Sequence, residues 1–272
     1  MNTEIKNAIQ AADSEAQYDE SAKRLLAQKY VLAHILVRTV EEFQGMEIEK
    51  VVSLIEGDPY ISKVPVASGL TNNDRNMEGK RFVGLNTEAG EKNEGLVRFD
   101  IIFYVRMRNG LAQMIINVEA QKDEPGSYQI LNRAIFYVSR LISSQKERDF
   151  VKSNYNDIKT VYSIWVCMNM PENSMCHIYL TKEDLLGKHN WKGNLNLVNI
   201  VMIGLTNALP ESHNEYGLHR LLCAMFSNEL SQQQKMKIME QEYHIPMEES
   251  FKEEVSICLL YTSPSPRDGL LS

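Results

Sequence analysis

The sequence predicts an α/β fold with a mixed central sheet, and three observations point to this class. Two strand-like segments, 99–105 and 114–121, flank Asn109-Gly110, a strong short-range signal for a β-hairpin. An amphipathic helix is expected next, over about 127–148, because its apolar residues recur at helical spacing. Segment 160–167 then has the apolar run of a buried strand, as expected after a crossover helix in a mixed sheet.

A further helix is expected near the N-terminus. Asp19-Glu20-Ser21 offers an N-cap, and apolar residues at helical spacing continue until Glu41 and Glu42 close the helix. These apolar residues are Leu25, Leu32, Leu36, Val40 and Phe43. Residues 1–20 before it are expected to be a lead-in that need not be ordered.

The hairpin has a defined register if its turn has two residues. A type I′ turn at Asn109-Gly110 pairs Arg108 with Leu111, so the numbers of paired residues sum to 219, provided that no bulge intervenes. Asp100 then lies directly opposite Glu119, and Cβ atoms of such neighbours are about 4.5–5.5 Å apart. Two carboxylates forced together in apolar surroundings require a cation or a shared proton.

Asp100 and Glu119 are therefore candidate ligands of a metal ion. Alternation along the second strand places Asn117, Glu119 and Gln121 on one face. The alternative is that the two acids are solvated residues on the wet side of a sheet. We favour the metal site because both strands are otherwise apolar, and a lone charged residue in an apolar strand usually has a function.

These residues carry a family resemblance. An Asp, a hairpin's length of chain and then Glu-X-Lys form the signature of the PD-(D/E)XK nuclease superfamily; here it reads Asp100…Glu119-Ala120-Gln121. The stretch from about Ser21 to Tyr243 resembles the branch of PD-(D/E)XK nuclease family transposases, relatives of the recombination-promoting nucleases. The resemblance is carried by EGLVRFDIIFYVRMRNG, NVEAQKDEP and LNRAIFYVSRLISSQKERDF.

The resemblance implies an αβββαβ core, with C-terminal helices beyond it, whose central hairpin holds the catalytic acids. It also implies that Asp100, Glu119 and the backbone carbonyl of Ala120 bind Mg²⁺, or Mn²⁺ in vitro, and that the reaction is hydrolysis of a DNA phosphodiester. This agrees with the oxygen ligands that Mg²⁺ prefers and with its usual support by one or two carboxylates plus substrate phosphates.

Gln121 stands where the family usually has lysine. A glutamine orients water but provides no positive charge, so the strength of catalysis is an open question. Lys122 is a candidate substitute, although strand alternation points it to the opposite face. The first helix of the superfamily often contributes another acid, and Glu41 and Glu42 are the candidates; the alternative is that both are solvated acids near a helix end.

The helix expected after the hairpin carries polar residues that the superfamily often turns toward the catalytic acids. Gln129, Arg133, Tyr137 and Arg140 lie at three- and four-residue spacing on one side. Arg133 is the best candidate for a phosphate contact. The alternative is that Arg133 and Tyr137 form a surface-packing pair.

Charge argues against strong binding of nucleic acid by the whole molecule. The chain has 29 basic and 36 acidic residues, a net charge of −7. A local excess of basic residues follows the hairpin and predicts modest, salt-sensitive affinity for DNA, unless it is only a solvated face. It consists of Arg133, Arg140, Lys146, Arg148, Lys152 and Lys159, against Glu147, Asp149 and Asp157.

The chain is expected to divide into the lead-in, a nuclease-like domain over 21–210, a C-terminal helical segment over 211–257 and a tail over 258–272. Further strands are expected at 64–66, 81–83, 176–180 and 197–205. The segment from Cys258 to Asp268 resembles a translated sequencing-library adapter, so we expect the natural sequence to continue differently after about Ile257. A disordered Ser/Pro tail is the alternative.

The compartment and partners follow from the same features. No apolar stretch of membrane-spanning length occurs, so a cytoplasmic protein without a membrane partner is expected. The cysteines lack paired metal-ligand spacing and are expected to be reduced core thiols; those considered are Cys167, Cys176 and Cys223. DNA is the expected partner, and a homodimer is left open.

The function expected is that of a Mg²⁺-dependent DNA endonuclease associated with transposition or recombination. The alternative is a catalytically degenerate nuclease fold that acts as a DNA-binding or protein-interaction module, which Gln121 and the acidic balance favour. An RNA-cleaving enzyme of similar fold is a third reading.

Overall fold

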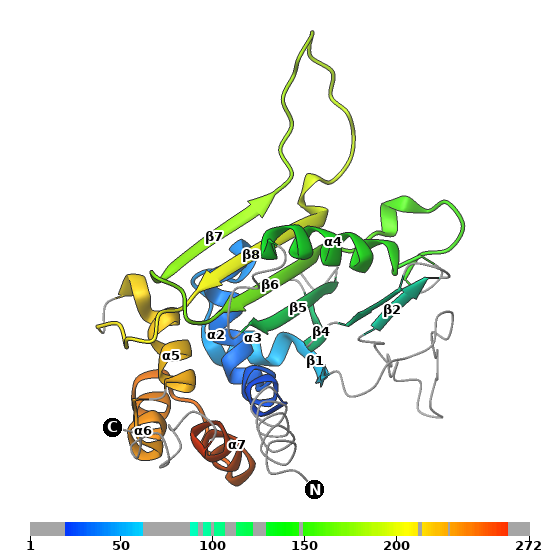
Figure 1. Cartoon of the computed structure of the whole chain (residues 1–272). Coiled ribbons are helices and arrows are strands. Elements are labelled where there is room, and N and C mark those ends of the chain that lie inside the picture. Colours follow the sequence, from blue (N-terminus) through cyan, green and yellow to red (C-terminus); the bar gives the residue numbers. More distant parts are fainter. Residues whose placement is uncertain are drawn as a thin grey trace, which may run out of the picture.

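The computed structural model describes residues 20–61, 88–91, 95–98, 101–106, 113–121, 129–146, 149–211, 214–227 and 229–260. Its centre is a six-stranded sheet with the order β1-β4-β5-β6-β8-β7 (Figure 1). The strands are β1 (Ile55–Ile61), β4 (Ile101–Arg106), β5 (Gln113–Gln121), β6 (Val161–Cys167), β7 (Ser174–Tyr179) and β8 (Val198–Gly204). A separate antiparallel pair joins β2 (Glu88–Glu91) to β3 (Gly95–Arg98).

Helices cover the sheet and extend beyond it. Residues 20–26 are helical and precede α2 (Lys29–Thr39), η1 (Glu41–Phe43) and α3 (Ile48–Leu54). The middle of the chain has α4 (Ile130–Ser143), η2 (Tyr155–Asp157) and η3 (Leu195–Leu197). The C-terminal elements are η4 (Asn214–Tyr216), α5 (Gly217–Phe226), α6 (Gln232–Tyr243) and α7 (Glu249–Leu260).

The sheet is mixed, as the sequence predicts. β4 is antiparallel to β1 and to β5, whereas β5 is parallel to β6 and β6 is parallel to β8. The outermost strand, β7, is antiparallel to β8. The parallel β5–β6 pair is connected through α4, because two adjacent parallel strands need a long crossover. The short strands expected at 64–66 and 81–83 lie outside the described residues.

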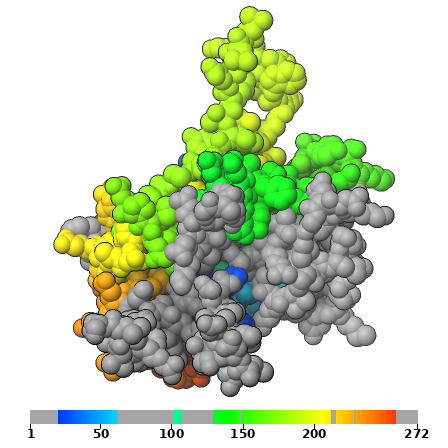
Figure 2. Space-filling model, in the orientation of Figure 1, coloured from blue at the N-terminus to red at the C-terminus, as the bar shows by residue number. Residues whose placement is uncertain are grey.

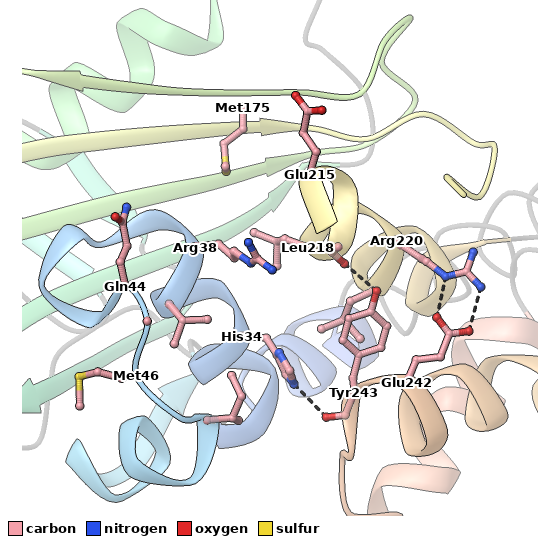
Figure 3. Close-up of a pocket in the computed structure, with 15 residues that line it drawn as sticks. His34, Arg38, Gln44, Met46, Met175, Glu215, Leu218, Arg220, Glu242 and Tyr243 are labelled. Atoms are coloured by element: carbon pink, nitrogen blue, oxygen red, sulfur yellow. Dashed lines mark hydrogen bonds and ion pairs between the residues drawn. The ribbon is translucent and has the colours of Figure 1, made fainter. Parts of the chain in front are cut away.

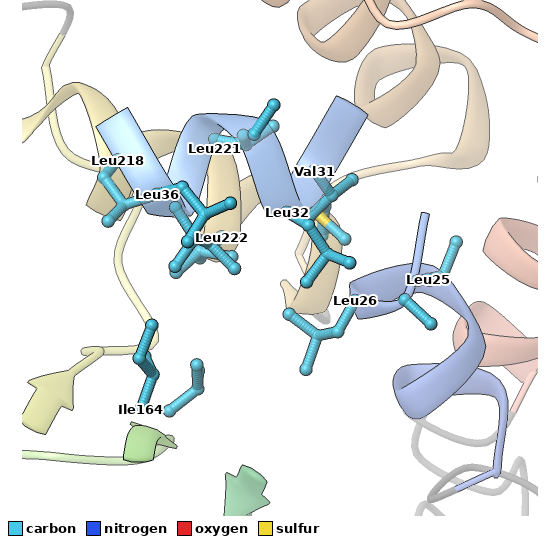
Figure 4. Close-up of a cluster of buried hydrophobic side chains, with 14 of the residues drawn as sticks. Leu25, Leu26, Val31, Leu32, Leu36, Ile164, Leu218, Leu221 and Leu222 are labelled. Atoms are coloured by element: carbon cyan, nitrogen blue, oxygen red, sulfur yellow. The ribbon is translucent and has the colours of Figure 1, made fainter. Parts of the chain in front are cut away.

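Both faces of the sheet are covered, so the central strand β6 is buried along its whole length. In β6, Tyr162, Ile164 and Val166 belong to one buried cluster, and Val161, Trp165 and Cys167 belong to a second. The first cluster includes leucines of α2 and α5, as Figure 4 shows. The second cluster packs against α4. Period-two alternation therefore assigns each residue of β6 to one of two cores.

The N-terminal helix differs from the single helix that the apolar spacing predicts. Residues 20–26 and α2 are separate, and Gln28 between them has an extended backbone with φ −64° and ψ 128°. Leu25, Leu26 and Ala27 are all buried. Val31, Leu32 and Ala33 of α2 are buried as well, and all six residues belong to one cluster. The break lets each helical piece turn its own apolar side inward.

The α4 helix is shorter than expected and ends at Ser143. The side chain of Gln145 explains why, because it bonds both polar atoms of a backbone segment just before β6. Its Oε1 accepts from Lys159 N at 2.7 Å, and its Nε2 donates to Lys159 O at 3.0 Å. Gln145 is fully buried, so these bonds satisfy polar groups that cannot reach water. They fix the end of the crossover against the start of β6.

No helix in the described part of the chain is long and apolar enough to cross a bilayer.

Candidate active site

The register of the hairpin is the one that a two-residue turn predicts. Ile102 pairs with Asn117, Tyr104 with Ile115, and Arg106 with Gln113, so the numbers in each pair sum to 219. No bulge interrupts these described pairs. Asp100 and the turn at 107–112 lie outside the described residues. The opposition of positions 100 and 119 remains a prediction, two residues beyond the last described pair.

The backbone of β5 also fixes which residues of β6 lie beside the candidate acids. Position 119 pairs with Trp165, and position 121 pairs with Cys167. Adjacent strands are about 4.8 Å apart, and paired positions share a face of the sheet. Positions 117, 119 and 121 therefore lie on the face of Trp165, which is the face that α4 covers.

Two residues of α4 pack against that tryptophan. The Tyr137 ring lies 5.5 Å from the Trp165 ring, between centroids. The guanidinium carbon of Arg133 lies 4.7 Å from the Tyr137 centroid and 5.3 Å from the Trp165 centroid. Arg133 Nη2 also donates to the Tyr137 hydroxyl at 2.8 Å. The alternative considered for Arg133, a packing pair with Tyr137, is therefore present, although Tyr137 is buried rather than on the surface. Both residues lie over the β6 partner of position 119.

This arrangement holds a cation in a defined orientation. A guanidinium over aromatic faces gains about 0.5–2 kcal/mol from the ring electrons when it is partly desolvated. Arg133 is half-buried and Trp165 is fully buried, with its Nε1 donating to Ser163 Oγ at 3.0 Å. A planar guanidinium fixed in this way can donate two parallel hydrogen bonds to a phosphate. The cluster of Arg133, Tyr137 and Trp165 is called the arginine platform below.

The other polar residues expected on α4 are not part of this platform. Gln129 is exposed at the N-cap, where its Oε1 accepts from Asn132 Nδ2 at 3.4 Å. Arg140 is buried in the last turn of the helix. The four polar residues expected on one side of α4 therefore lie in three environments: at the exposed N-cap, over Trp165 and buried in the last turn. Only the middle part of that side of α4 faces Trp165 of β6.

Glu41 and Glu42 lie in η1, away from the platform. Their charges act on Tyr162, which belongs to the cluster on the opposite face from Trp165. Burial raises the pKa of Tyr162, a hydrogen bond with Asn196 lowers it, and the two carboxylates raise it further. Lys122, the remaining accessory candidate, lies outside the described residues.

The basic run after the hairpin does not form a continuous cationic surface. Arg140 is buried, and Lys159 donates to Asp149 Oδ1 at 2.8 Å. Lys146 and Lys152 are exposed, whereas Arg148 lies outside the described residues. Among the members of this run that the structure describes, Arg133 lies over Trp165, the strand partner of position 119.

A hollow of about 750 Å³ lies elsewhere, on the face of the sheet opposite α4 (Figure 3). Residues of α2, α5 and α6 line it, and their polar groups bond to one another. His34 Nε2 is 3.0 Å from Tyr243 O, and the Tyr243 hydroxyl donates to Gly217 O at 2.7 Å. Arg220 makes two bonds to Glu242, at 2.7 and 2.8 Å. These bonds join the three helices, and no local pattern in the sequence predicts them.

Burial governs the titration of two groups around this hollow. It lowers the pKa of His34, although the bond to Tyr243 O opposes that effect. It also raises the pKa of Tyr243 to about 12. Both groups are therefore held uncharged at neutral pH, and they serve as hydrogen-bonding links between helices.

Within the described part of the chain, the cysteines and histidines are not grouped into a second site. Cys167 and Cys223 are buried free thiols, as expected, whereas Cys176 is exposed on β7 and so is not the core thiol that the sequence analysis expects. His219 is buried, with Nε2 3.0 Å from Ser174 O. Among the side chains that the structure describes, no group of three His, Cys, Asp or Glu residues could hold a metal ion. The side chains at positions 100 and 119 are not among them.

The Arg220–Glu242 pair predicts a pH dependence of stability. Hydrogen bonds from Arg220 lower the pKa of Glu242, so the pair stabilises the fold above the ordinary glutamate pKa and loses this effect as the pH falls through the lowered value. Glu242→Gln should cost about 0.5–1 kcal/mol at pH 7, since the carboxylate is about one-third exposed. Urea denaturation at pH 7 and pH 3 measures this, and the cost should shrink at about pH 3.

Glu240→Gln is the matched control, because Glu240 is an exposed residue of the same helix. It should change the free energy of unfolding by less than about 0.5 kcal/mol at either pH. A cost of Glu242→Gln that is the same at both pH values would contradict the pairing.

No protein-family model matches the chain, and no curated protein or solved structure matches it. Membership of a family is therefore an expectation from the sequence, and function has to be inferred from residues and geometry.

Proposed function

We propose that the chain is a Mg²⁺-dependent DNA endonuclease with a PD-(D/E)XK-type core, associated with transposition or recombination. One observation carries this proposal: the described β4–β5 pairs keep the register in which paired numbers sum to 219. Continued by two residues, that register brings Asp100 opposite Glu119 on the face shared with Trp165. An acid pair there is adjacent to the arginine platform.

The order of elements supports the proposed core. A helical N-terminal region precedes β1, β4 and β5, which are consecutive antiparallel neighbours in the sheet. α4 follows and leads to β6, which is parallel to β5. This order is compatible with the αβββαβ arrangement that the resemblance implies, with the separate β2–β3 pair inserted between β1 and β4 and with β8 and β7 extending the sheet on one side.

The residues present fit a magnesium ion. Asp100, Glu119 and the Ala120 carbonyl are oxygen donors, which Mg²⁺ prefers, and three such donors leave positions for water and for phosphate oxygens. When bound, the ion supplies a water of lowered pKa and neutralises charge on the scissile phosphate. Gln121 would orient the attacking water through its amide. Since the amide is neutral, it provides orientation without charge stabilisation.

Arg133 would hold the substrate phosphate. Its guanidinium is kept over Tyr137 and Trp165, and Trp165 is the strand partner of position 119. A positive charge that is already held beside the reacting phosphate does not have to be reoriented as the transition state forms, so no free energy is spent on that step. The absence of a motif lysine makes this arginine the leading source of positive charge for the substrate.

The second candidate function is a degenerate nuclease fold that binds DNA or protein without cleavage. Gln121 in place of lysine and a net charge of −7 favour it. Incubation of supercoiled plasmid with Mg²⁺, with Mn²⁺ and with a chelator separates the two functions, because a binding module shifts DNA without nicking it. RNA offered in parallel tests for ribonuclease activity.

Asp100→Asn and Glu119→Gln should each reduce metal-dependent nicking by more than about 100-fold. Loss of a partner that only orients a metal ligand already costs about 10–100-fold, and these residues would be the ligands themselves. The measurement is the initial rate of plasmid nicking, with circular dichroism to verify the fold. Asp157→Asn is the control, because Asp157 is exposed in η2, and it should keep the wild-type rate.

Activity that persists in both acid variants would refute the catalytic assignment. A wild-type chain that binds the plasmid but never nicks it, with either metal, would support the degenerate fold instead.

Arg133→Gln should weaken DNA binding and reduce the slope of log affinity against log salt by about 1, as expected for loss of one phosphate contact. Binding to a short duplex is measured across a salt series with Ca²⁺, which also takes oxygen ligands. Lys237→Gln removes an exposed charge on α6 and serves as the control. If both variants give the wild-type slope, Arg133 does not contact phosphate.

A further inference from the structure

A long arm projects from the edge of the central sheet. It consists of residues 180–194, which connect β7 to η3 and β8. In Figure 1 it rises away from the sheet and from α4, and in Figure 2 it stands clear of the rest of the molecule. Every residue of the arm is exposed.

The arm carries large apolar side chains in water. Leu185 is 89% exposed, Leu186 98% and Trp191 77%. Single exposed apolar residues are common on protein surfaces, but three that are each more than three-quarters exposed on one projecting arm mark an interaction site. Since the arm stands clear of its own chain, the partner must come from outside.

Contacts within the arm give it a definite shape. Lys182 Nζ lies 2.8 Å from Asp184 Oδ1 and also donates to His189 O at 3.0 Å, which joins its two sides. The rings of His189 and Trp191 meet edge to face with centroids 4.6 Å apart. Trp191 is thus presented on an ordered support, which reduces the entropy that binding would cost.

A second exposed apolar surface lies on the outer side of α4. Leu131 is 39% exposed, and Ile135 and Phe136 are each 47% exposed. The inner side of the same helix is buried against the sheet, so α4 has apolar residues on both sides. These three residues are called the α4 face.

We propose that the arm of one chain packs against the α4 face of a second copy, and that the second copy returns the same contact. A two-fold dimer of this kind is self-complementary, because each chain offers one arm and one α4 face. Each copy would bury six large apolar side chains. One tryptophan alone can bury about 150–250 Å², so the contact is of the order of the roughly 800 Å² per partner in a standard interface.

Charge favours a second copy over DNA as the partner. The arm has three lysines and two acids, a net charge of +1; with −7 for the chain, the remainder carries −8. α4 itself carries Arg133 and Arg140 and no acid. The groups of the arm that complement it are therefore the carboxylates of Glu183 and Asp184. Glu183 and Asp184 directly precede Leu185, and these carboxylates would repel phosphates near the apolar tip.

The test is the mass of the full chain in solution, measured by sedimentation across a range of micromolar concentrations. The wild type should sediment as a dimer of 31.2 kDa chains. The arm variant, Leu185→Ser with Leu186→Ser, should raise the dissociation constant of the dimer by at least about ten-fold. Lys188→Ser with Asn190→Ser is the matched control on the same arm and should dimerise as the wild type does.

A complementary variant tests the other half of the contact. Ile135→Ser with Phe136→Ser should also raise the dissociation constant of the dimer by at least about ten-fold, and circular dichroism verifies its fold. A mixture of the two variants can form a heterodimer with one intact contact, so a tagged arm variant should capture the α4-face variant more strongly than it captures itself.

Two results would overturn the proposal. One is a wild-type chain that remains monomeric at every concentration. If, in addition, the arm variant binds duplex DNA more weakly than the wild type does, the arm is a DNA contact. The other is an arm variant that dimerises as tightly as the wild type.

Discussion

The register of the β4–β5–β6 ladder is the constraint on which the rest of the site depends. Side chains alternate across a strand, so a slip of one residue would move every side chain of β5 to the other face. The described pairs fix β5 against β4 on one side and against β6 on the other. They determine that position 119 shares a face with Trp165, and hence that Arg133 of α4 stands beside it.

The two faces of the sheet have different roles in this protein. One face supports the large core with α2 and α5, where bonds such as Arg220–Glu242 and His34–Tyr243 join helices around a hollow. The other face is covered by α4, which turns its inner side to Trp165 and leaves Leu131, Ile135 and Phe136 exposed outside. In our account α4 therefore serves both the proposed catalytic site and the proposed dimer.

Local patterns were enough for some of these features and not for others. Asn109-Gly110 implies the register that the described pairs have, because a two-residue turn leaves one way to pair its strands. Arg133 and Tyr137 are four residues apart on a helix, so their contact was also predictable. The pairing of position 119 with Trp165 could not be predicted from local sequence, because the register of two parallel strands is set by tertiary packing across their crossover connection. The break at Gln28 and the exposure of the arm have the same cause: both depend on what packs nearby rather than on local spacing.

The most direct test of the central claim is a cross-link between positions 100 and 119. In a chain whose four native cysteines are replaced by alanine, Asp100→Cys with Glu119→Cys should form a disulfide on mild oxidation, because directly opposed residues have Cα atoms within the roughly 4.4–6.8 Å that a disulfide spans. Asp100→Cys with Ala120→Cys should not, because position 120 lies on the opposite face of β5. Peptide mass mapping identifies the bridge. A bridge from 100 to 120, and none from 100 to 119, would contradict the opposition of the two acids and with it the proposed metal site.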